Sequence, residues 1–309
     1  MSERTLDPGD GLLAPAFLAR LAQLQLLSRR LAEARRRGRR QTRRAGAGLE
    51  AIDVRAYAPG DDPRRIDWKA YARFERLLVR VVADEAPLRL GLVLDTSGSM
   101  AFGAPSKLRQ AARVAAGLAA VALGAEDRVA ALAAADAPRL VTRASGGRRG
   151  LQQLLGALEG LGAGRGTSLA TAASAATGAL GGRGLCVVLS DLLDPAGALA
   201  GARALRLRGH EVALVEVLTP EELDPPDLAG CELEDAETGD LLELPPEGAL
   251  AAYRECLEAH REALDAEAAE LGVPVLRVTT ADPFDAVVVR ALEAGLLRGA
   301  GLAGRERAA

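Results

Sequence analysis

Oxygen-bearing side chains follow an apolar, strand-like stretch of this sequence. The run LRLGLVL, residues 88–94, leads directly into Asp95, Thr96, Ser97, Gly98 and Ser99. Alternate residues of an extended segment point the same way, so a D-x-S-x-S spacing aims one carboxylate and two hydroxyls at a common point. Such hard oxygen donors suit Mg²⁺ or Mn²⁺, which take octahedral oxygen coordination and usually retain waters. The spacing predicts a divalent-cation site at the end of a buried strand.

Two further oxygen donors are expected in comparable positions. Thr167 lies in GRGTSLA, where a helix opens, and Asp191 lies in CVVLSDLLD, where a second apolar strand ends. Together with Asp95, Ser97 and Ser99 they give five oxygen ligands on three loops. The alternative is that the first three residues form a polar turn that caps the next helix, because Asp and Ser favour such positions. Asp194, which precedes a proline, is interpreted as a helix N-cap rather than as a second carboxylate of the site.

The elements that must position these residues begin after Pro87. Apolar strands alternate with helices, which predicts an α/β fold with a doubly wound, mostly parallel sheet covered on both faces. In such sheets ligands bind at the carboxyl ends of the strands. The strands are expected near 88–95, 129–135, 185–190, 211–217 and 273–278, and the helices near 106–124, 148–160, 168–180, 197–208, 248–271 and 283–297.

Changes in sequence texture predict four segments. Residues 1–44 should hold an amphipathic helix, with Leu18, Leu21, Leu24, Leu27 and Leu31 on one stripe, and an arginine-rich arm. Residues 45–86 should form a small β-containing subregion, with a turn forced by Pro59, Gly60 and Pro63. Residues 87–298 should form the main domain, with a hairpin near 231–244 that turns at Thr238 and Gly239. Residues 299–309 are expected to be a flexible tail.

The set Asp95, Ser97, Ser99, Thr167 and Asp191 resembles the metal-ion-dependent adhesion site of von Willebrand factor A domains. The resemblance implies the Rossmann-type layers of that fold. It also implies that the two serines bind the metal directly, the threonine directly or through water, and the aspartates largely through waters. One coordination position would stay open for a glutamate or aspartate of a partner protein.

The segment YAPGDDPRRIDWKAYAR, residues 57–73, resembles the signature of the bacterial and archaeal family called domain of unknown function 58. The match continues through the ETGD hairpin and the final VPVLRVTT strand, and so covers roughly residues 45–290. The resemblance implies an adaptor or chaperone-like partner of a MoxR-type AAA+ ATPase. Longer members carry membrane segments before the signature, whereas we expect no membrane integration here.

Within that signature, five residues are candidates for partner binding: Asp61, Asp62, Arg65, Asp67 and Trp68. The alternative is a rigid turn in which Trp68 is buried and the three aspartates form caps or salt bridges. Nothing in the residue types requires more than this second interpretation.

Composition narrows the class of protein only modestly. Lys and Arg total 39 and Asp and Glu 42, for a net charge of −3, and the three cysteines suggest neither disulfides nor a zinc knuckle. The first twenty residues do not read as a secretory signal, so a cytoplasmic location is expected. The arginines of residues 29–44 have no interleaved aromatics for base stacking. A solvated arm or an acidic protein partner is therefore favoured over specific nucleic-acid binding.

Catalysis by this chain is not expected. Ser97 occupies the place where a haloacid dehalogenase-type phosphatase needs a second aspartate, and DTSG lacks the second copy that an aspartic protease needs. No G-x-x-x-x-G-K-[ST] loop is present. The leading hypothesis is a metal-dependent protein–protein interaction module. The alternatives are a structural module that binds through its N-terminal helix and basic arm, and a Mg²⁺-dependent hydrolase.

Overall fold

The computed structural model describes residues 11–28, 54–80, 87–164, 166, 168–226, 231–243 and 248–296. The chain divides into two compact units, of which the larger comprises Met1–Arg29 with Pro87–Ala309 and the smaller comprises Arg30–Ala86. The predicted arginine-rich arm, residues 29–44, and the tail, residues 299–309, lie outside the described residues.

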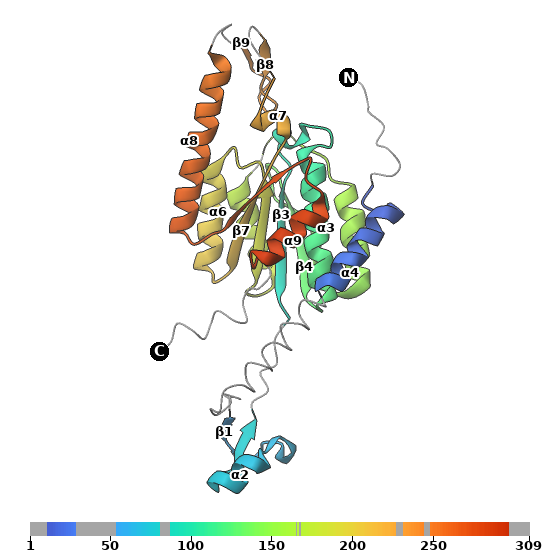
Figure 1. The fold of residues 1–309 in the computed structure, drawn as a ribbon, viewed down its shortest axis with the longest axis vertical. Coiled ribbons are helices and arrows are strands. Elements are labelled where there is room, and N and C mark those ends of the chain that lie inside the picture. Colours follow the sequence, from blue (N-terminus) through green and yellow to red (C-terminus); the bar gives the residue numbers. More distant parts are fainter. Residues whose placement is uncertain are drawn as a thin grey trace. The chain divides into compact units, whose positions relative to one another are not determined.

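A six-stranded sheet forms the centre of the larger unit (Figure 1), and its order is β10-β7-β6-β3-β4-β5. Five strands are parallel, and only β5 at one edge runs antiparallel to its neighbour β4. Numbered along the sheet's own chain order, the strands follow 3-2-1-4-5-6, the order of a doubly wound fold. The predicted fold class is confirmed. The strands are β3 (Arg89–Asp95), β4 (Arg128–Ala134), β5 (Arg139–Ser145), β6 (Leu185–Ser190), β7 (Glu211–Leu218) and β10 (Val275–Thr279).

Helices cover both faces of this sheet, because side chains of a strand alternate between them. Leu90, Leu92 and Leu94 of β3 belong to one buried cluster, whereas Val93 belongs to the other. The first cluster packs under the helix over residues 15–28, α3 (Lys107–Gly124), α4 (Gly147–Glu159) and α9 (Phe284–Glu293). The second packs under α5 (Leu169–Leu180), α6 (Pro195–Leu207) and α8 (Ala249–Glu270).

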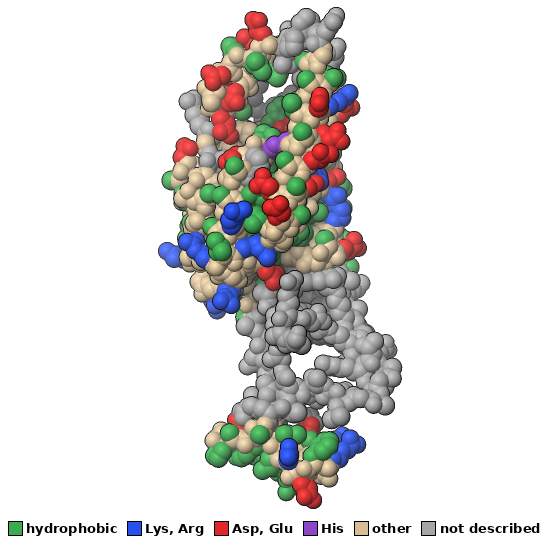
Figure 2. All heavy atoms as spheres, turned by 90° about the vertical axis from the view of Figure 1, so that its left-hand side faces the viewer, with side chains coloured by type: hydrophobic (Ala, Val, Ile, Leu, Met, Phe, Trp, Pro, Cys, Tyr) green, Lys and Arg blue, Asp and Glu red, His purple; other side chains and the backbone are tan. Residues whose placement is uncertain are grey.

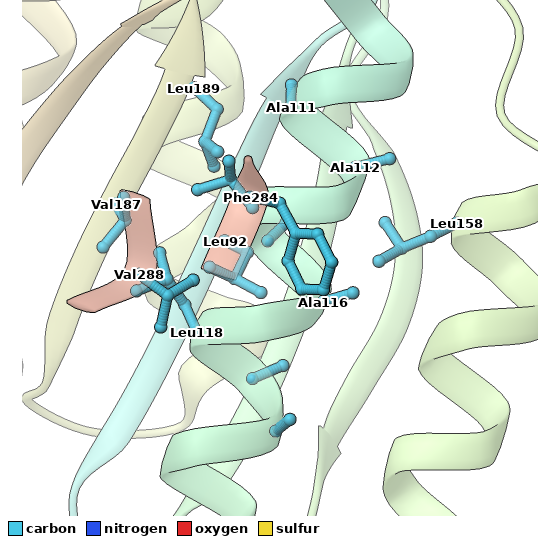
Figure 3. Packing of buried hydrophobic residues seen from close by; sticks show 14 of the residues in the cluster. Leu92, Ala111, Ala112, Ala116, Leu118, Leu158, Val187, Leu189, Phe284 and Val288 are labelled. Carbon is cyan, nitrogen blue, oxygen red and sulfur yellow. The ribbon is translucent and has the colours of Figure 1, made fainter. Parts of the chain in front are cut away.

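Small residues let the helices of the first face approach closely. Ala116 of α3 lies beside the Phe284 ring of α9 (Figure 3). A Cβ added at Gly117 would lie 2.6 Å from a Val288 methyl, so only glycine fits there without a shift. The scarcity of aromatic residues is compensated by tight alanine packing of this kind.

The helix over residues 15–28 is part of this core. Leu21 and Leu24 are buried as expected, but Leu18 and Leu27 are 39% and 38% exposed, and the buried face is completed instead by Phe17. The Phe17 ring stacks on Phe284 with 4.5 Å between centroids. The expected leucine stripe is therefore confirmed at Leu21 and Leu24 and wrong at Leu18 and Leu27, and Leu31 lies outside the described residues. The buried face of this helix is the one that contacts α9, through Phe17 and Phe284.

The smaller unit contains β1 (Val54–Ala56) and β2 (Leu78–Arg80), which pair antiparallel. Between them lie the 3-10 turn η1 (Pro63–Arg65) and the helix α2 (Trp68–Phe74), where only a turn was expected. The β-containing character of the subregion is as predicted.

A hairpin and a short helix complete the larger unit. The helix α7 (Pro220–Leu223) follows β7, and β8 (Glu232–Glu234) pairs antiparallel with β9 (Leu241–Glu243). This confirms the hairpin predicted near 231–244. Within the described residues, no helix is long and apolar enough to cross a bilayer.

Candidate metal centre

The predicted site lies where the winding direction of the sheet reverses. From β3 the chain continues to β4 on one side, and from β6 it continues to β7 on the other. The carboxyl ends of β3 and β6 therefore flank the crevice in which doubly wound folds bind ligands. Asp95 is the last residue of β3, and Asp191 directly follows β6.

The loop after β3 holds the Asp95 carboxylate with hydrogen bonds to both of its oxygens. The Ser97 backbone N–H donates to Asp95 Oδ1 at 2.9 Å, and the Ser190 hydroxyl donates to Asp95 Oδ2 at 2.5 Å. Asp95 and Ser97 are 2% and 1% exposed. Burial raises the pKa of Asp95, the bonds from Ser190 and Ser97 oppose this rise, and repulsion by Asp191 adds to it. Hydrogen bonds from Ser97 and Ser190 therefore hold this buried carboxylate in place.

Three of the predicted ligands converge. The Ser97 and Ser99 hydroxyl oxygens lie 3.1 Å apart, and Ser99 Oγ donates to Asp191 Oδ2 at 2.7 Å. In an octahedral Mg²⁺ site with metal–oxygen distances of about 2.0–2.1 Å, neighbouring ligand oxygens lie about 2.9 Å apart. These oxygens are therefore spaced as neighbouring ligands of one small cation would be. Asp95 supports the loop through its bond to the Ser97 backbone.

Thr167 lies outside the described residues. Three residues before it, the Gly164 N–H donates to the Thr96 carbonyl at 2.6 Å. A Cβ added at Gly98 would lie 3.3 Å from the Gly164 carbonyl oxygen. The loop after α4 therefore contacts the loop that follows β3.

A buried lysine was missed by the sequence reasoning. Lys107, at the first turn of α3, is 0% exposed, and its Nζ lies 2.8 Å from Asp191 Oδ2 and 2.6 Å from Glu222 Oε1. Lysine is rare in this arginine-rich chain, and that rarity was a signal that Lys107 could have a special role. Whether a charged side chain is buried, however, depends on tertiary partners that the sequence does not show. Lys107 links the candidate metal ligand to α7.

Glu222 is itself fixed at the start of α7. Its carboxylate accepts from the Thr219 backbone N–H at 2.7 Å, and the Thr219 hydroxyl accepts from the Glu222 N–H at 3.1 Å, which makes a capping box. The Tyr253 hydroxyl of α8 donates to the Glu222 carbonyl at 2.7 Å. Lys107 thus has a rigid second carboxylate as its partner.

The charges around the site fit a divalent cation. Lys107 pairs with both Asp191 and Glu222, so the three carboxylates Asp95, Asp191 and Glu222 exceed this lysine by two negative charges. This excess matches the charge of Mg²⁺, and buried charges are costly unless they are paired or coordinate a metal. Within the described ranges, no group of three or more His, Cys, Asp or Glu side chains is placed to hold a metal ion. A site here would draw on two carboxylates and on hydroxyls.

The turn after β6 is unusual in its backbone. Leu192 is fully buried and adopts φ +57°, a left-handed conformation that leucine seldom takes. Its N–H donates to Ser190 Oγ at 3.0 Å, and His260 Nε2 of α8 lies 3.1 Å from its carbonyl oxygen. Two residues on, the Asp194 carboxylate accepts from the Gly197 N–H at 3.1 Å, so it is the predicted N-cap of α6.

The signature residues of the smaller unit lie in structural roles. Asp62 caps η1, Asp67 caps α2, and Asp61 accepts from the Ala58 N–H at 2.9 Å. The side chain of Arg65 is not among those that the structure describes. The rigid-turn interpretation predicted that Trp68 is buried, but this residue is 60% exposed. It is the first residue of α2 and lies on a face that the small unit does not cover.

Comparison with known proteins adds family relationships. The model of the family described as protein of unknown function DUF58 matches residues 53–263. Uncharacterized proteins of Mycobacterium bovis and of Mycobacterium tuberculosis strain H37Rv are each 33% identical over 251 residues, which cover 79% of this chain and 79% of theirs.

Solved structures of low identity match parts of the chain. The conserved hypothetical protein BatB from Bacteroides thetaiotaomicron matches with a TM-score of 0.45 and 18% identity, over 69% of this chain and 100% of that one. An aerotolerance-related membrane protein from Bacteroides fragilis matches with a TM-score of 0.47 and 19% identity over the same shares. A von Willebrand factor type A protein from Catenulispora acidiphila matches with a TM-score of 0.33 and 16% identity, over 59% of this chain and 43% of that one.

Proposed function

This chain belongs to the family described as protein of unknown function DUF58, and from that starting point we propose that it is a metal-dependent protein–protein interaction module. Asp95, Ser97, Ser99 and Asp191 would hold a Mg²⁺ or Mn²⁺ ion, with Thr167 as a fifth donor. The observation that carries the proposal is the convergence of the Ser97, Ser99 and Asp191 oxygens at spacings of 3.1 Å and 2.7 Å.

The residue types favour binding over catalysis. A bound Mg²⁺ would supply a Lewis-acidic position that a carboxylate oxygen can fill. Neutral hydroxyl ligands leave the charge of such an ion less compensated than a carboxylate-rich cage would. The buried Asp95 holds the loop that presents the two serines, and Lys107 takes up one side of the Asp191 carboxylate. These residues bind and orient, and we propose no turnover by this chain alone.

The proposed partner is a protein that offers a glutamate or aspartate to the metal. In keeping with the family resemblance of the sequence, we propose a MoxR-type AAA+ ATPase or its client in this role. The exposed Trp68 of the smaller unit, whose ring meets Tyr71 edge-on at 6.2 Å, offers an aromatic surface for a second contact. Aromatic side chains are enriched at the centres of interfaces.

Titration calorimetry with Mg²⁺ tests the metal site. Ser99→Ala removes one candidate ligand and should weaken binding at least about tenfold, a loss typical of a damaged metal site. Ser174→Ala, which removes a hydroxyl bonded to a backbone carbonyl within α5, is the matched control and should bind as the wild type does. Equal affinity of all three proteins would contradict the proposal.

Co-precipitation with a MoxR-type ATPase tests the partner. Capture should require Mg²⁺, should be lost in EDTA, and should be lost with Ser99→Ala but not with Ser174→Ala. Capture that is indifferent to both the chelator and the variant would instead favour the alternative in which the N-terminal helix and basic arm bind the partner. The buried face of that helix, Phe17, Leu21 and Leu24, is already used within the larger unit.

A further inference from the structure

The turn of the β8–β9 hairpin is held in one conformation by its own polar groups. Asp235 Oδ1 accepts from the Glu237 and Thr238 N–H groups, each at 2.8 Å. The Asp235 N–H donates to the Asp240 carbonyl at 2.8 Å, and Gly239 adopts φ +77°. These bonds fix the backbone around Glu237, so its side chain leaves the turn in a defined direction.

This turn lies against the candidate metal loop. A Cβ added at Gly98 would lie 2.5 Å from the Ala236 carbonyl oxygen, so the loop and the turn are in contact at the centre of D-T-S-G-S. In Figure 1 the hairpin descends beside α7 toward the end of the sheet where β3 finishes. Glu237 is the next residue along the turn.

The Glu237 carboxylate is without a cationic neighbour in the described part of the chain. Partial desolvation, and then repulsion by Asp95 and Asp191, raise its pKa above the usual value. Its charged neighbours in the described part of the chain are carboxylates, with Asp235 and Asp136 in addition to Asp95 and Asp191, and its side chain makes no hydrogen bond or ion pair there. A carboxylate held near two buried carboxylates is favourable when a cation lies between them.

The surroundings of the turn are acidic as well. Between Gly209 and Tyr253 the sequence contains no lysine or arginine. Figure 2 shows acidic side chains gathered over the upper part of the larger unit, on the side of α8. An incoming acidic partner would meet repulsion here unless the metal's charge were available to it.

We infer that Glu237 is a ligand supplied in cis, whose carboxylate takes the metal's open position until the carboxylate of a partner replaces it. The inference rests on the proposed metal site and deepens it. The turn would then act as an internal competitor for the partner, at the high effective concentration that tethering gives. A partner would have to displace the turn before it reached the metal.

The hairpin is suited to such displacement. Its strands are three residues each, and all six strand residues are exposed. A two-stranded hairpin is marginally stable by itself. Moving it away therefore disrupts little of the buried core, whereas the rigid turn keeps Glu237 in place while the hairpin is docked.

Water-proton relaxation with Mn²⁺ as the probe tests this inference, because it counts the waters bound directly to the ion. Glu237→Gln should bind Mn²⁺ several-fold more weakly and should show about one more bound water than the wild type. Added acetate should remove that extra water from the variant and leave the wild type unchanged. Glu234→Gln, an equal change of charge in β8 of the same hairpin, is the matched control and should behave as the wild type.

The outcomes separate the two claims. If the wild type binds Mn²⁺ in a Ser99-dependent manner but Glu237→Gln has the same water count and affinity, the in-cis ligand is wrong and the metal site stands. If Glu234→Gln weakens Mn²⁺ binding as much as Glu237→Gln does and neither gains a water, the effect is one of general charge, and the inference is also overturned. If the wild type binds no Mn²⁺, both claims fail.

Discussion

Lys107 Nζ lies 2.8 Å from Asp191 Oδ2, and both side chains are almost completely buried. The same carboxylate oxygen accepts the Ser99 hydroxyl at 2.7 Å, so the lysine and the candidate metal loop share one acceptor. Since Lys107 also pairs with Glu222, the lysine connects the carboxyl end of β6 to α7, the short helix that precedes the hairpin. A change of charge at Asp191 should therefore also affect the contact between Lys107 and α7.

Replacing Lys107 with methionine should destabilise the larger unit. Removing one partner of a buried ion pair leaves unpaired charge and costs about 3–5 kcal/mol, so the free energy of unfolding in urea without metal should fall by about that amount. Lys107→Met/Glu222→Gln should recover part of the loss, because it removes one of the stranded carboxylates. An unchanged unfolding midpoint in the single variant would show that the lysine is not paired as described.

The same variant should respond more strongly to metal than the wild type does. With Lys107 gone, the buried carboxylates have more uncompensated charge, so Mg²⁺ should raise its unfolding free energy by more than it raises that of the wild type. Urea titrations of both proteins with and without Mg²⁺ measure this difference. An equal or smaller metal response in Lys107→Met would count against a cation beside Asp191.

Gly98→Ala should be destabilising for a steric reason. The new Cβ would lie 2.5 Å from the backbone oxygen of Ala236, which cannot rotate away as a flexible side chain would. Overpacking of this kind costs about 1–3 kcal/mol. Gly178→Ala on α5 is the control, since a Cβ there meets nothing within 4 Å and should stabilise by about 0.5–1 kcal/mol. Thermal unfolding of both variants checks the contrast; no loss in Gly98→Ala would mean that the turn does not lie on the loop.

Asp127 gives a pH-dependent prediction at the other end of β3. Burial raises the pKa of Asp127 to about 6, although the Leu88 N–H donates to it at 2.8 Å. Because the folded pKa lies above the unfolded one, the folded state binds more protons, and this group's contribution to stability rises as the pH falls from about 7 to 4. Asp127→Asn should therefore raise the unfolding free energy at pH 7–8 by roughly 1 kcal/mol, after allowance for partial exposure.

That gain should vanish near pH 4, where the wild-type carboxyl is protonated in the folded state. Urea unfolding of the wild type and of Asp127→Asn at both pH values measures it. A gain that is constant across this pH range would contradict the assignment of the raised pKa to Asp127.

The core of the fold could be predicted from the sequence because strands buried on both faces read as continuous apolar runs. Elements that depend on less obvious signals were missed. The edge strand β5 carries Arg139 and Arg143 and is half exposed, so its pattern is that of a loop. The helix α2 is preceded by its N-cap Asp67, which accepts from the Lys69 and Ala70 N–H groups. This aspartate was a usable signal, but it lies among residues that are also typical of turns.

The candidate site could be predicted in part for a related reason. Asp95, Ser97, Ser99 and Asp191 end neighbouring strands, so topology brings them together once the sheet order is known. Lys107 and Glu237 reach the same region from a helix and from a distant hairpin. Their contribution depends on how α3 and the turn dock, which spacing along the chain does not reveal.

The most direct measurement of the central claim is a crystal structure of the protein grown with Mn²⁺, with anomalous scattering recorded to locate the ion. The account predicts one peak beside Asp191, about 2.0–2.2 Å from the hydroxyl oxygens of Ser97 and Ser99. The Glu237 carboxylate should fill a remaining position. Strong anomalous density elsewhere, with these hydroxyls still bonded to each other and to Asp191, would contradict it.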